Sequence, residues 1–502
     1  MISTVLTQRG YSIPKCELSV ADMNAIKKDL TISPAVPGAP VQSRVTFPAY
    51  RESLTKVFVP RCYGVNKFGP PQENRLPKGD DISLAFVGTL KAVQQEVVDT
   101  FLSHVEPGGG CGLIQLPCGF GKTVVANFLI AALKKKTLII VNTEMLLNQW
   151  IERIRQFLPD ARVGTIRGPT VDVDNKDIVI GMLMSLSVKD YPVSTFAPFG
   201  FVVVDEVHHI ASETFSRSLF KNSTFYMLGL SATMDRKDGT TYLFKMFLGD
   251  VVAKRERPKD DGVIVRGAQF LAPEDEDFSE VEVDFRGTTA SAKMVGKISS
   301  YAPRCEFILR LLTEMLVENG AQQILLLGQH KVLLKYLFEA ISSRSIATVG
   351  NYLGGMKKAA LAESETKQII LATYTMAAEG LDIPTLTTLV MGSPMTSVEQ
   401  PVGRILRRKH DFPPLVVDVV DGHSNFQNQW RKRCTFYRSQ GYDIYWRSMA
   451  DYEAGAGWDL MEGARSRGAS KRRKPSAAAV AEEKEDEETS AALMQLLKLR
   501  SG

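Results

Sequence analysis

The stretch LIQLPCGFGKTVVANFLIAAL, residues 113–133, joins an apolar run, a glycine-containing turn and an amphipathic segment. The apolar run predicts a buried strand, and the segment after the turn predicts a helix. Gly119 and Gly121 allow backbone N–H groups to close around phosphate oxygens at the amino terminus of that helix. The pattern predicts a phosphate loop in which Lys122 pairs with the β and γ phosphates of a nucleotide and Thr123 with Mg²⁺.

The strict phosphate-loop pattern has a glycine where this chain has Leu116, so the loop is a variant. A chance Gly-Lys-Thr triplet in a surface loop is the alternative interpretation. The position of the triplet between a predicted strand and a predicted helix favours the phosphate loop.

Short apolar runs on either side of the loop predict further strands. Between positions 113 and 230 they read LIQL, TLIIV, DIVIG, FVVVD and YMLGL, and longer helical patterns separate them. A second series, QILLLG, QIILAT, TLVMG and PLVVDVVD, follows near positions 324, 369, 390 and 417. Runs rich in Val, Ile and Leu are typical of strands buried on both faces of a parallel sheet. The predicted fold class is therefore α/β, with two parallel-sheet domains in tandem.

The segments outside these two series are polar or rich in proline. Prolines punctuate the first eighty residues, and KRERPKDDG and APEDEDFSEVEVD separate the two series. The predicted segments are an amino-terminal accessory module at 1–85, a first α/β domain at 86–253, a connector at 254–300, a second α/β domain at 301–452 and a disordered tail at 453–502.

Charge is distributed unevenly along the predicted tail. The basic cluster GARSRGASKRRK precedes an acidic run at 482–488, in a background too poor in apolar residues to form a core. The basic cluster is a candidate for binding phosphates, and the apolar segment ALMQLLKL for docking in a partner groove. A targeting signal in SKRRKP is the alternative interpretation.

Composition excludes several classes of protein. A chain of 502 residues, 44% hydrophobic and 23% charged, is typical of a globular protein with more than one core. No run approaches the roughly 18 apolar residues of a membrane helix, and the start MISTVLTQRGY lacks the apolar core of a signal peptide. The six cysteines are scattered without a CxxC pair, so we expect reduced thiols in an intracellular protein.

A second candidate site lies in FVVVDEVHH, residues 201–209. Its apolar run predicts a strand that presents Asp205 and Glu206 at its carboxyl end, where α/β sheets bind ligands. Asp205 is suited to hold Mg²⁺, and Glu206 to orient and deprotonate an attacking water. An ordinary strand end is the alternative, but the pair follows the phosphate loop by about eighty residues, which favours one nucleotide site. A metal site at His208 and His209 is not supported, because no Cys or His partners lie nearby.

A third candidate is VEQPVGRILRR, residues 398–408, which offers Gln400, Arg404, Arg407 and Arg408 on a predicted helical stretch. Arg404 and Arg407 are three residues apart, so we expect them on one helix face. That geometry suits arginine fingers that reach across a domain interface to a γ-phosphate. A solvated basic helix is the alternative interpretation.

Five segments, taken in order along the chain, resemble motifs I, II, III, V and VI of superfamily 2 helicases. They are LPCGFGKT, DEVHH, GLSAT, EGLDIP and QPVGRILR. LKAVQ, at 90–94, is similar to the element that reads adenine in this group, with Lys91 where arginine is commoner. LPCGFGKT and DRKDG resemble the XPB-like branch, and especially the poxvirus-type transcript-release DNA helicase of large cytoplasmic DNA viruses. The opening RGYSIPK and VPRCYG are similar to the same viral group, so the resemblance extends to about Tyr445.

This resemblance implies two RecA-like domains that hydrolyse ATP between them with Mg²⁺. The catalytic residues it implies are Lys122, Asp205, Glu206, Arg404 and Arg407, with Thr123 and Asp205 holding the metal. The nucleotide-binding residues it implies are Gln94, Pro117, Cys118, Gly119, Phe120, Gly121, Lys122, Thr123, Gly380, Asp382 and Gln400. Ser231, Ala232 and Thr233 would couple the ATP state to the grip on nucleic acid.

The chain also departs from the family pattern at two places. Met184 stands where a glutamine is usual for the viral group, which removes a polar contact expected with nucleic acid. Arg236, Lys237 and Asp238 resemble the Arg-Glu-Asp element of the XPB-like branch only loosely.

The function implied by the resemblance is an ATP-dependent DNA helicase or translocase, with DNA and the transcription or replication machinery as partners and no membrane association. An RNA helicase and an ATP-gated nucleic-acid clamp without strand separation are the alternatives. The DEAD tetrad is absent and the nearest resemblance is to DNA motors, which favours DNA. The expected location is intracellular, in a cytoplasmic viral factory or virion, with the nucleus as an alternative from the basic tail cluster.

Overall fold

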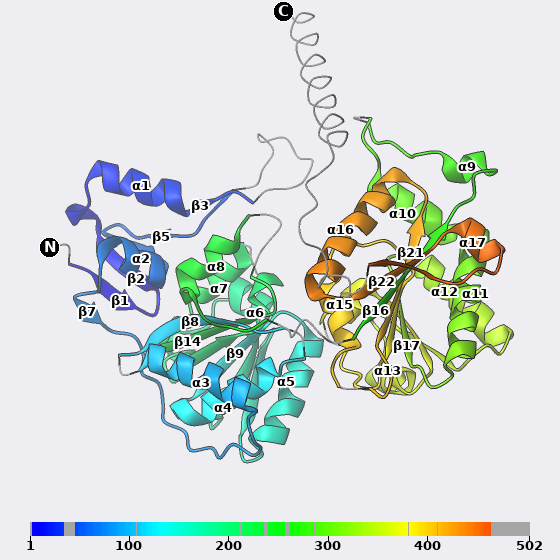
Figure 1. Ribbon diagram of the computed structural model, residues 1–502. Coiled ribbons are helices and arrows are strands. Elements are labelled where there is room, and N and C mark those ends of the chain that lie inside the picture. Colours follow the sequence, from blue (N-terminus) through cyan, green and yellow to red (C-terminus); the bar gives the residue numbers. More distant parts are fainter. Residues whose placement is uncertain are drawn as a thin grey trace, which may run out of the picture.

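The architecture rests on two eight-stranded sheets and one five-stranded sheet (Figure 1). The computed structural model describes residues 3–34, 46–106, 108–117, 119–209, 213–234, 239–256, 262–285, 287–379, 381–408 and 410–462. The five-stranded sheet lies near the amino terminus, and the two eight-stranded sheets follow it along the chain. The predicted α/β class with two parallel-dominated sheets is confirmed.

The first eight-stranded sheet has the order β11-β10-β12-β9-β13-β14-β8-β15. Its strands are β8 (Gly110–Gln115), β9 (Thr137–Val141), β10 (Val163–Arg167), β11 (Thr170–Val171), β12 (Ile178–Met182), β13 (Phe201–Val204), β14 (Tyr226–Ser231) and β15 (Val251–Lys254). Its helices are α3 (Ala92–Val105), α4 (Lys122–Leu133), α5 (Glu144–Phe157), α6 (Leu183–Val188), α7 (Glu213–Leu219) and α8 (Thr241–Leu248). All neighbours pair in parallel except β10 and β11.

Alternate residues of the central strands supply two separate cores, as the pleat of a sheet requires. Ile139 and Val203 pack with α3, α4 and α5 on one face, whereas Ile140 and Val204 face α6, α7 and α8 on the other. Because both faces are covered, every residue of β9 and β13 is buried. This explains why these strands appear in the sequence as continuous apolar runs without alternation.

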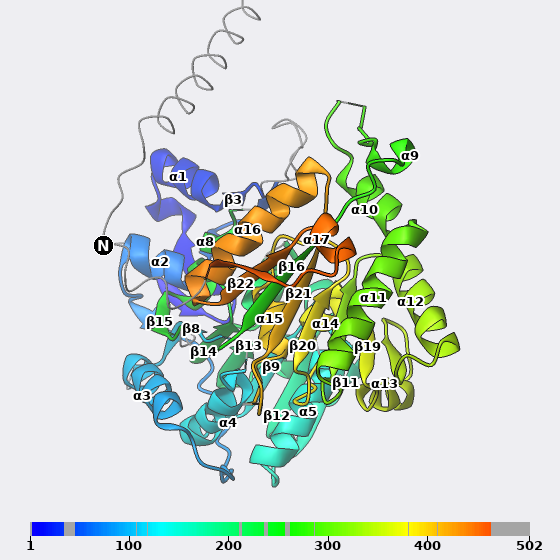
Figure 2. The same ribbon diagram turned by 45° about the vertical axis from the view of Figure 1, so that its right-hand side comes forward.

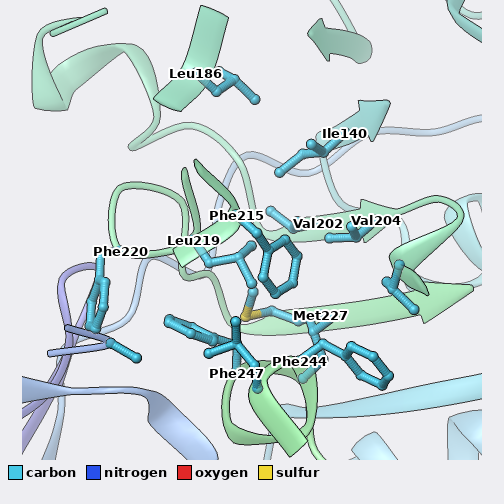
Figure 3. Close-up of a cluster of buried hydrophobic side chains, with 14 of the residues drawn as sticks. Ile140, Leu186, Val202, Val204, Phe215, Leu219, Phe220, Met227, Phe244 and Phe247 are labelled. Atoms are coloured by element: carbon cyan, nitrogen blue, oxygen red, sulfur yellow. The ribbon is translucent and has the colours of Figure 1, made fainter. Parts of the chain in front are cut away.

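The amino-terminal module packs against the α6–α8 face of the first sheet. It contains β1 (Val5–Thr7), β2 (Gly10–Pro14), α1 (Val20–Leu30), β3 (Thr31–Ile32), β4 (Phe47–Pro48), β5 (Arg51–Glu52), β6 (Lys56–Val59), α2 (Arg61–Phe68) and β7 (Glu73–Asn74). Its buried Tyr11 and Ile13 belong to the same apolar cluster as Phe220 and Phe247. Figure 3 shows residues that the first domain contributes to this cluster, in which the Phe247 ring lies 5.9 Å from that of Phe215 and 5.0 Å from that of Phe220, measured between ring centroids. The module and the first sheet therefore share one core.

The second eight-stranded sheet has the order β18-β19-β17-β20-β21-β16-β22-β23. Its strands are β16 (Ile264–Phe270), β17 (Ile324–Gly328), β18 (Val349–Tyr352), β19 (Ile369–Thr373), β20 (Thr388–Met391), β21 (Leu415–Asp421), β22 (Asp443–Arg447) and β23 (Asp459–Glu462). Its helices are α9 (Glu276–Ser279), α10 (Ser291–Ser300), α11 (Ala302–Glu318), α12 (Lys331–Ser343), α13 (Lys358–Glu365), α14 (Tyr374–Glu379), α15 (Glu399–Arg404), α16 (Ser424–Gln440) and α17 (Met449–Glu453). Figure 2 shows α11 and α12 side by side against one face of this sheet.

Two strands of the second sheet lie in segments predicted to be outside it. β16 falls within the predicted connector, yet it pairs in parallel with both β21 and β22 and is a central strand. β23 falls within the predicted tail and pairs with β22 in antiparallel fashion, and Trp458 just before it lies 5.1 Å from the Arg266 guanidinium. The polar flanks of both strands concealed them, because sheet pairing with distant strands supplies the burial that their local sequence does not show.

Two ion pairs lie in the interior of the second domain. Arg304 donates from Nη2 to Asp421 at 2.8 Å and from Nη1 to the Gly392 carbonyl at 2.9 Å. Arg433 donates from Nε to Asp418 at 2.6 Å. All four side chains are fully buried. The guanidinium groups thereby tie helix α11 to the ends of β20 and β21, and helix α16 to the middle of β21.

None of the helices in the described part of the chain combines the length and the apolar character needed to cross a membrane.

We expect Arg304→Met to destabilise the second domain by about 3–5 kcal/mol, because it leaves the Asp421 carboxylate buried without its cation. Arg344→Met is the matched control, because it breaks a bidentate pair with Glu306 in which the side chains are 49% and 34% exposed. Such exposed pairs contribute about 0–1 kcal/mol. Urea unfolding followed by circular dichroism measures both. Equal losses for the two variants would contradict the assignment.

Candidate nucleotide-binding site between the two sheets

The predicted phosphate loop lies between β8 and α4 and has the backbone geometry that its glycines suggest. Gly119 and Gly121 have φ of +80° and +95°, a region that favours glycine. A Cβ at Gly121 would lie 2.6 Å from the Gln94 amide nitrogen. Helix α4 begins at Lys122, so its free N–H groups and positive dipole end point into the loop.

Gln94, predicted to read the base, is buried against the back of this loop. Its side-chain oxygen accepts from the Lys91 backbone N–H at 2.9 Å, and its amide donates to the Phe120 carbonyl at 2.7 Å. Gln94 therefore couples the start of α3 to the phosphate loop. Its contact with a nucleotide stays a prediction.

The acidic pair at the end of β13 faces the loop. The Lys122 ammonium donates to Glu206 Oε1 at 2.6 Å. Glu206 has φ of +47°, unusual for a residue with a side chain, and its backbone N–H donates to Asp205 Oδ1 at 2.9 Å. Strained backbone of this kind is found at functional sites. Glu206 therefore contacts the loop through Lys122 and the Asp205 carboxylate through its own backbone N–H.

Asp205 lies deeper than Glu206 and is held by a side chain that the motif analysis did not single out. The Trp150 indole on α5 donates to Asp205 Oδ2 at 2.8 Å. Burial, together with the nearby charge of Glu206, raises the pKa of Asp205 to about 6, although the Lys122 charge and the Trp150 hydrogen bond act in the opposite direction. A cation placed beside this carboxylate would favour its ionised form.

A hydrogen-bond chain crosses from the first domain to the second through His208. Gln400 Nε2 lies 2.9 Å from His208 Nε2, and His208 Nδ1 lies 2.7 Å from the Ser231 hydroxyl. With Gln400 as donor, His208 carries its proton on Nδ1 and donates to Ser231, and the Ser231 hydroxyl donates to the Thr233 carbonyl. Both ring nitrogens of His208 are therefore engaged in hydrogen bonds.

The second domain contributes two arginines, but not on one helix as predicted. Helix α15 ends at Arg404, and Arg407 follows in a turn. Both guanidinium groups still donate to the Leu381 carbonyl at 2.8 Å, because the turn brings Arg407 back toward the same backbone group. Arg407 also pairs with Asp382, and Asp382 accepts from Arg153 of the first domain at 2.6 Å.

These side chains meet in a single pocket of about 340 Å³ between the two sheets. The predicted residues that line it are Gly119, Gly121, Lys122, Thr123, Asp205, Glu206, Asp382, Arg404 and Arg407. Pro117, Ala232, Thr233 and Gln400 line an adjacent cavity of about 400 Å³. Cys118 and Gly380, and the Arg236–Asp238 element, lie outside the described residues.

The pocket is also lined by residues that were not predicted, among them Asn142, Trp150 and Arg153. Asn142 directly follows β9, so the rule that places ligands at strand carboxyl ends could have found it. Its Oδ1 is buried and has no hydrogen-bond partner among the described residues. Trp150 and Arg153 are three apart on α5, but nothing in their local sequence distinguishes them from ordinary residues of an amphipathic helix.

Two predicted features do not contribute to this pocket. Met184 lies on α6 with 57% of its surface exposed, so an apolar side chain does stand where a polar contact is usual. Arg408 is exposed and lines a separate surface cavity with His410 and Phe412.

Comparisons with known proteins agree with this geometry. Residues 88–236 match the family model described as type III restriction enzyme, res subunit. A protein of Acanthamoeba polyphaga mimivirus, named as a putative ATP-dependent RNA helicase, is 33% identical over 458 residues, 88% of this chain and 86% of its own length. A protein of African swine fever virus with the same description is 28% identical over 377 residues, 70% of this chain and 73% of its own length.

Among solved structures, S. cerevisiae Dbp5 bound to RNA and ADP BeF3 aligns with a TM-score of 0.51 at 13% identity, over 74% of this chain and 92% of that one. This likeness supports the arrangement of two RecA-like domains in tandem. The chain belongs to the superfamily 2 helicases, in the group that includes these ATP-dependent helicases of large DNA viruses.

Proposed function

We propose that this superfamily 2 helicase uses ATP hydrolysis in the interdomain pocket to move along or unwind DNA. The observation that carries the proposal is that the phosphate loop and acidic pair of the first domain line one pocket with the arginines of the second. A γ-phosphate bound there would contact both domains, so its loss would weaken their association. ATP turnover would then be linked to domain movement.

In this proposal each charged residue of the pocket has a distinct task. Lys122 binds the β and γ phosphates, and its departure from Glu206 releases that carboxylate to accept a proton from the attacking water. Arg404 and Arg407 stabilise charge on the phosphoryl group in the transition state. On ATP binding, Arg407 would leave Asp382 for the phosphate, just as Lys122 would leave Glu206 for the phosphates.

The Thr123 hydroxyl and the Asp205 carboxylate are the residues that would hold Mg²⁺. Both are hard oxygen donors, and Mg²⁺ bound to nucleotides usually takes only one or two protein ligands. Within the described residues no group of three or more His, Cys, Asp or Glu side chains could hold a metal, so the site would be completed by phosphate oxygens and water. When bound, the metal would neutralise phosphate charge.

We place the nucleic acid across both domains and held mainly by its phosphates, so that the motor reads little sequence. DNA is favoured by the resemblance to the XPB-like branch and by the absence of a DEAD tetrad. The specific observation that favours RNA is that the mimivirus and African swine fever virus relatives are named RNA helicases. A role in viral transcription or transcript release, in a cytoplasmic factory or virion, is part of the proposal, and the residues after 462 are its candidate partner-binding segment.

We expect Lys122→Ala and Glu206→Gln to abolish ATP turnover with the fold intact, because each removes a group directed at phosphate or water. Glu206→Gln should still bind ATP, since Lys122 and the loop remain. Steady-state phosphate release and fluorescent-nucleotide binding measure the two properties. Wild-type rates in both purified variants would rule out the site.

Arg407→Ala should lower turnover at least about a hundredfold while ATP affinity changes little, because a finger acts mainly on transition-state charge. Arg404→Ala should lower turnover similarly and also loosen ATP. The matched control is Arg408→Ala, which removes the neighbouring exposed cation outside the pocket and should keep normal rates. If all three variants hydrolyse ATP at the wild-type rate, the arginines belong to a solvated helix face and do not act in catalysis.

The choice of nucleic acid is tested by ATPase assays with no nucleic acid, single-stranded DNA, duplex DNA and RNA, with Glu206→Gln protein as the control for contaminating ATPases. We expect DNA to stimulate hydrolysis more than RNA does. Stimulation by RNA alone would establish the RNA helicase alternative. Binding of nucleic acid without any change in turnover would favour an ATP-gated clamp.

A further inference from the structure

Two cysteines from different parts of the molecule lie in direct contact. Cys62 is in the first turn of α2 in the amino-terminal module, and Cys111 is in β8 of the first domain. Their sulfur atoms are 2.8 Å apart. A disulfide has an S–S length of about 2.05 Å, so a shift of about 0.8 Å would bring the two atoms to bonding distance.

The two thiols differ in their surroundings. Cys62 is 9% exposed and its sulfur lies 3.6 Å from the Phe247 carbonyl, whereas Cys111 is only partly buried. The hydrogen bond from Cys62, together with the Arg61 charge, lowers the pKa of Cys111 to about 7, although burial acts in the opposite direction. The same hydrogen bond and burial raise the pKa of Cys62. Cys111 is therefore the sulfur that ionises more readily and the more reactive of the two.

We propose that Cys62 and Cys111 are an oxidative modification site, at which a peroxide converts the thiol pair into a disulfide that covalently joins the amino-terminal module to the first domain. The Cys111 thiolate attacks one oxygen of hydrogen peroxide and breaks the O–O bond, giving a sulfenic acid and hydroxide. The Cys62 sulfur then attacks the Cys111 sulfur and displaces the sulfenic oxygen as water. In sum, two thiols are oxidised and one hydrogen peroxide is reduced to two waters.

The position of the pair predicts what the bond does and what it leaves unchanged. The bond would close a loop of about fifty residues between the amino-terminal module and the first domain, which restricts the unfolded chain and raises the unfolding temperature. Cys111 lies near the start of β8, whereas the phosphate loop follows the other end of that strand. Basal ATP hydrolysis should therefore continue in the oxidised protein.

Other cysteines on the chain provide internal comparisons. Cys16, in the same module as Cys62, is exposed. Cys305, in the second domain, is buried, and its thiol donates to the Ser299 carbonyl at 3.8 Å. Neither has the sulfur neighbour that Cys62 and Cys111 provide for each other, so neither should reach a disulfide within one molecule.

The decisive experiment treats full-length reduced protein with a small excess of hydrogen peroxide, blocks the remaining thiols with N-ethylmaleimide and maps tryptic peptides by mass spectrometry without reductant. We expect peptide 62–67 to be joined to peptide 92–122 and to be released by a phosphine reductant. Because Cys118 shares the second peptide, fragment ions that cleave between Gly112 and Pro117 must place the link on Cys111. Cys62 and Cys111 recovered unlinked, whether alkylated or oxidised to sulfinic acid, would overturn the proposal.

Matched variants test whether the disulfide stabilises the protein. Peroxide should raise the unfolding temperature of the wild-type and Cys16→Ser proteins, and reductant should reverse the rise. Cys62→Ser and Cys111→Ser should show no rise. A rise equal to that of the wild-type protein in either of these two variants would contradict the proposed disulfide. If these two variants fail to fold, the test rests on the wild-type protein alone. The proposal then requires both the reversible rise in unfolding temperature and the linked peptide, and the absence of either one overturns it.

Discussion

Parallel pairing is the constraint on which the rest of the structure depends, because parallel strands all end at the same edge of their sheet. In the first domain this edge brings together Lys122 after β8, Asp205 after β13 and Ser231 at the end of β14, although more than a hundred residues separate the first from the last. The same rule gathers the end of β19 and the loop after β20 in the second domain. Each motif is therefore local, but the site is a product of strand order.

Carboxylates hold the cations of the pocket in position. Lys122 is paired with Glu206, and Asp382 accepts from Arg153 of the first domain and pairs with Arg407 of the second. The phosphates of a bound triphosphate can replace these carboxylates, because arginine and lysine side chains bind phosphate and carboxylate oxygens in the same way. Nucleotide binding would therefore affect the domain arrangement, because the Arg153–Asp382 pair is also a contact between the two domains. The chain from Ser231 through His208 to Gln400 adds a second contact between the domains.

Sequence patterns indicated the fold class, the motif order and most of the pocket, because these depend on local features: continuous apolar runs, glycines at positive φ and charges after strands. They did not place β16 or β23, whose burial comes from partners far along the chain. The amino-terminal module shows no clear hydrophobic periodicity in its sequence either, because its strands are short and its apolar residues complete the core of the first domain. Arg407 was expected on a helix, and the structure ends that helix at Arg404.

What the sequence determined by itself is the chemistry: a phosphate loop, an acidic pair and two arginines, each recognisable within a dozen residues because spacing and residue type are local properties. Only the tertiary structure decided which other groups share the pocket. Trp150 donates to Asp205 and Arg153 pairs with Asp382 because helix α5 packs against β9 and β12 and reaches the second domain, a relation that no local pattern encodes. The contact between Cys62 and Cys111 has the same origin, since 48 residues lie between them and only the packing of α2 against the first domain brings the sulfurs together.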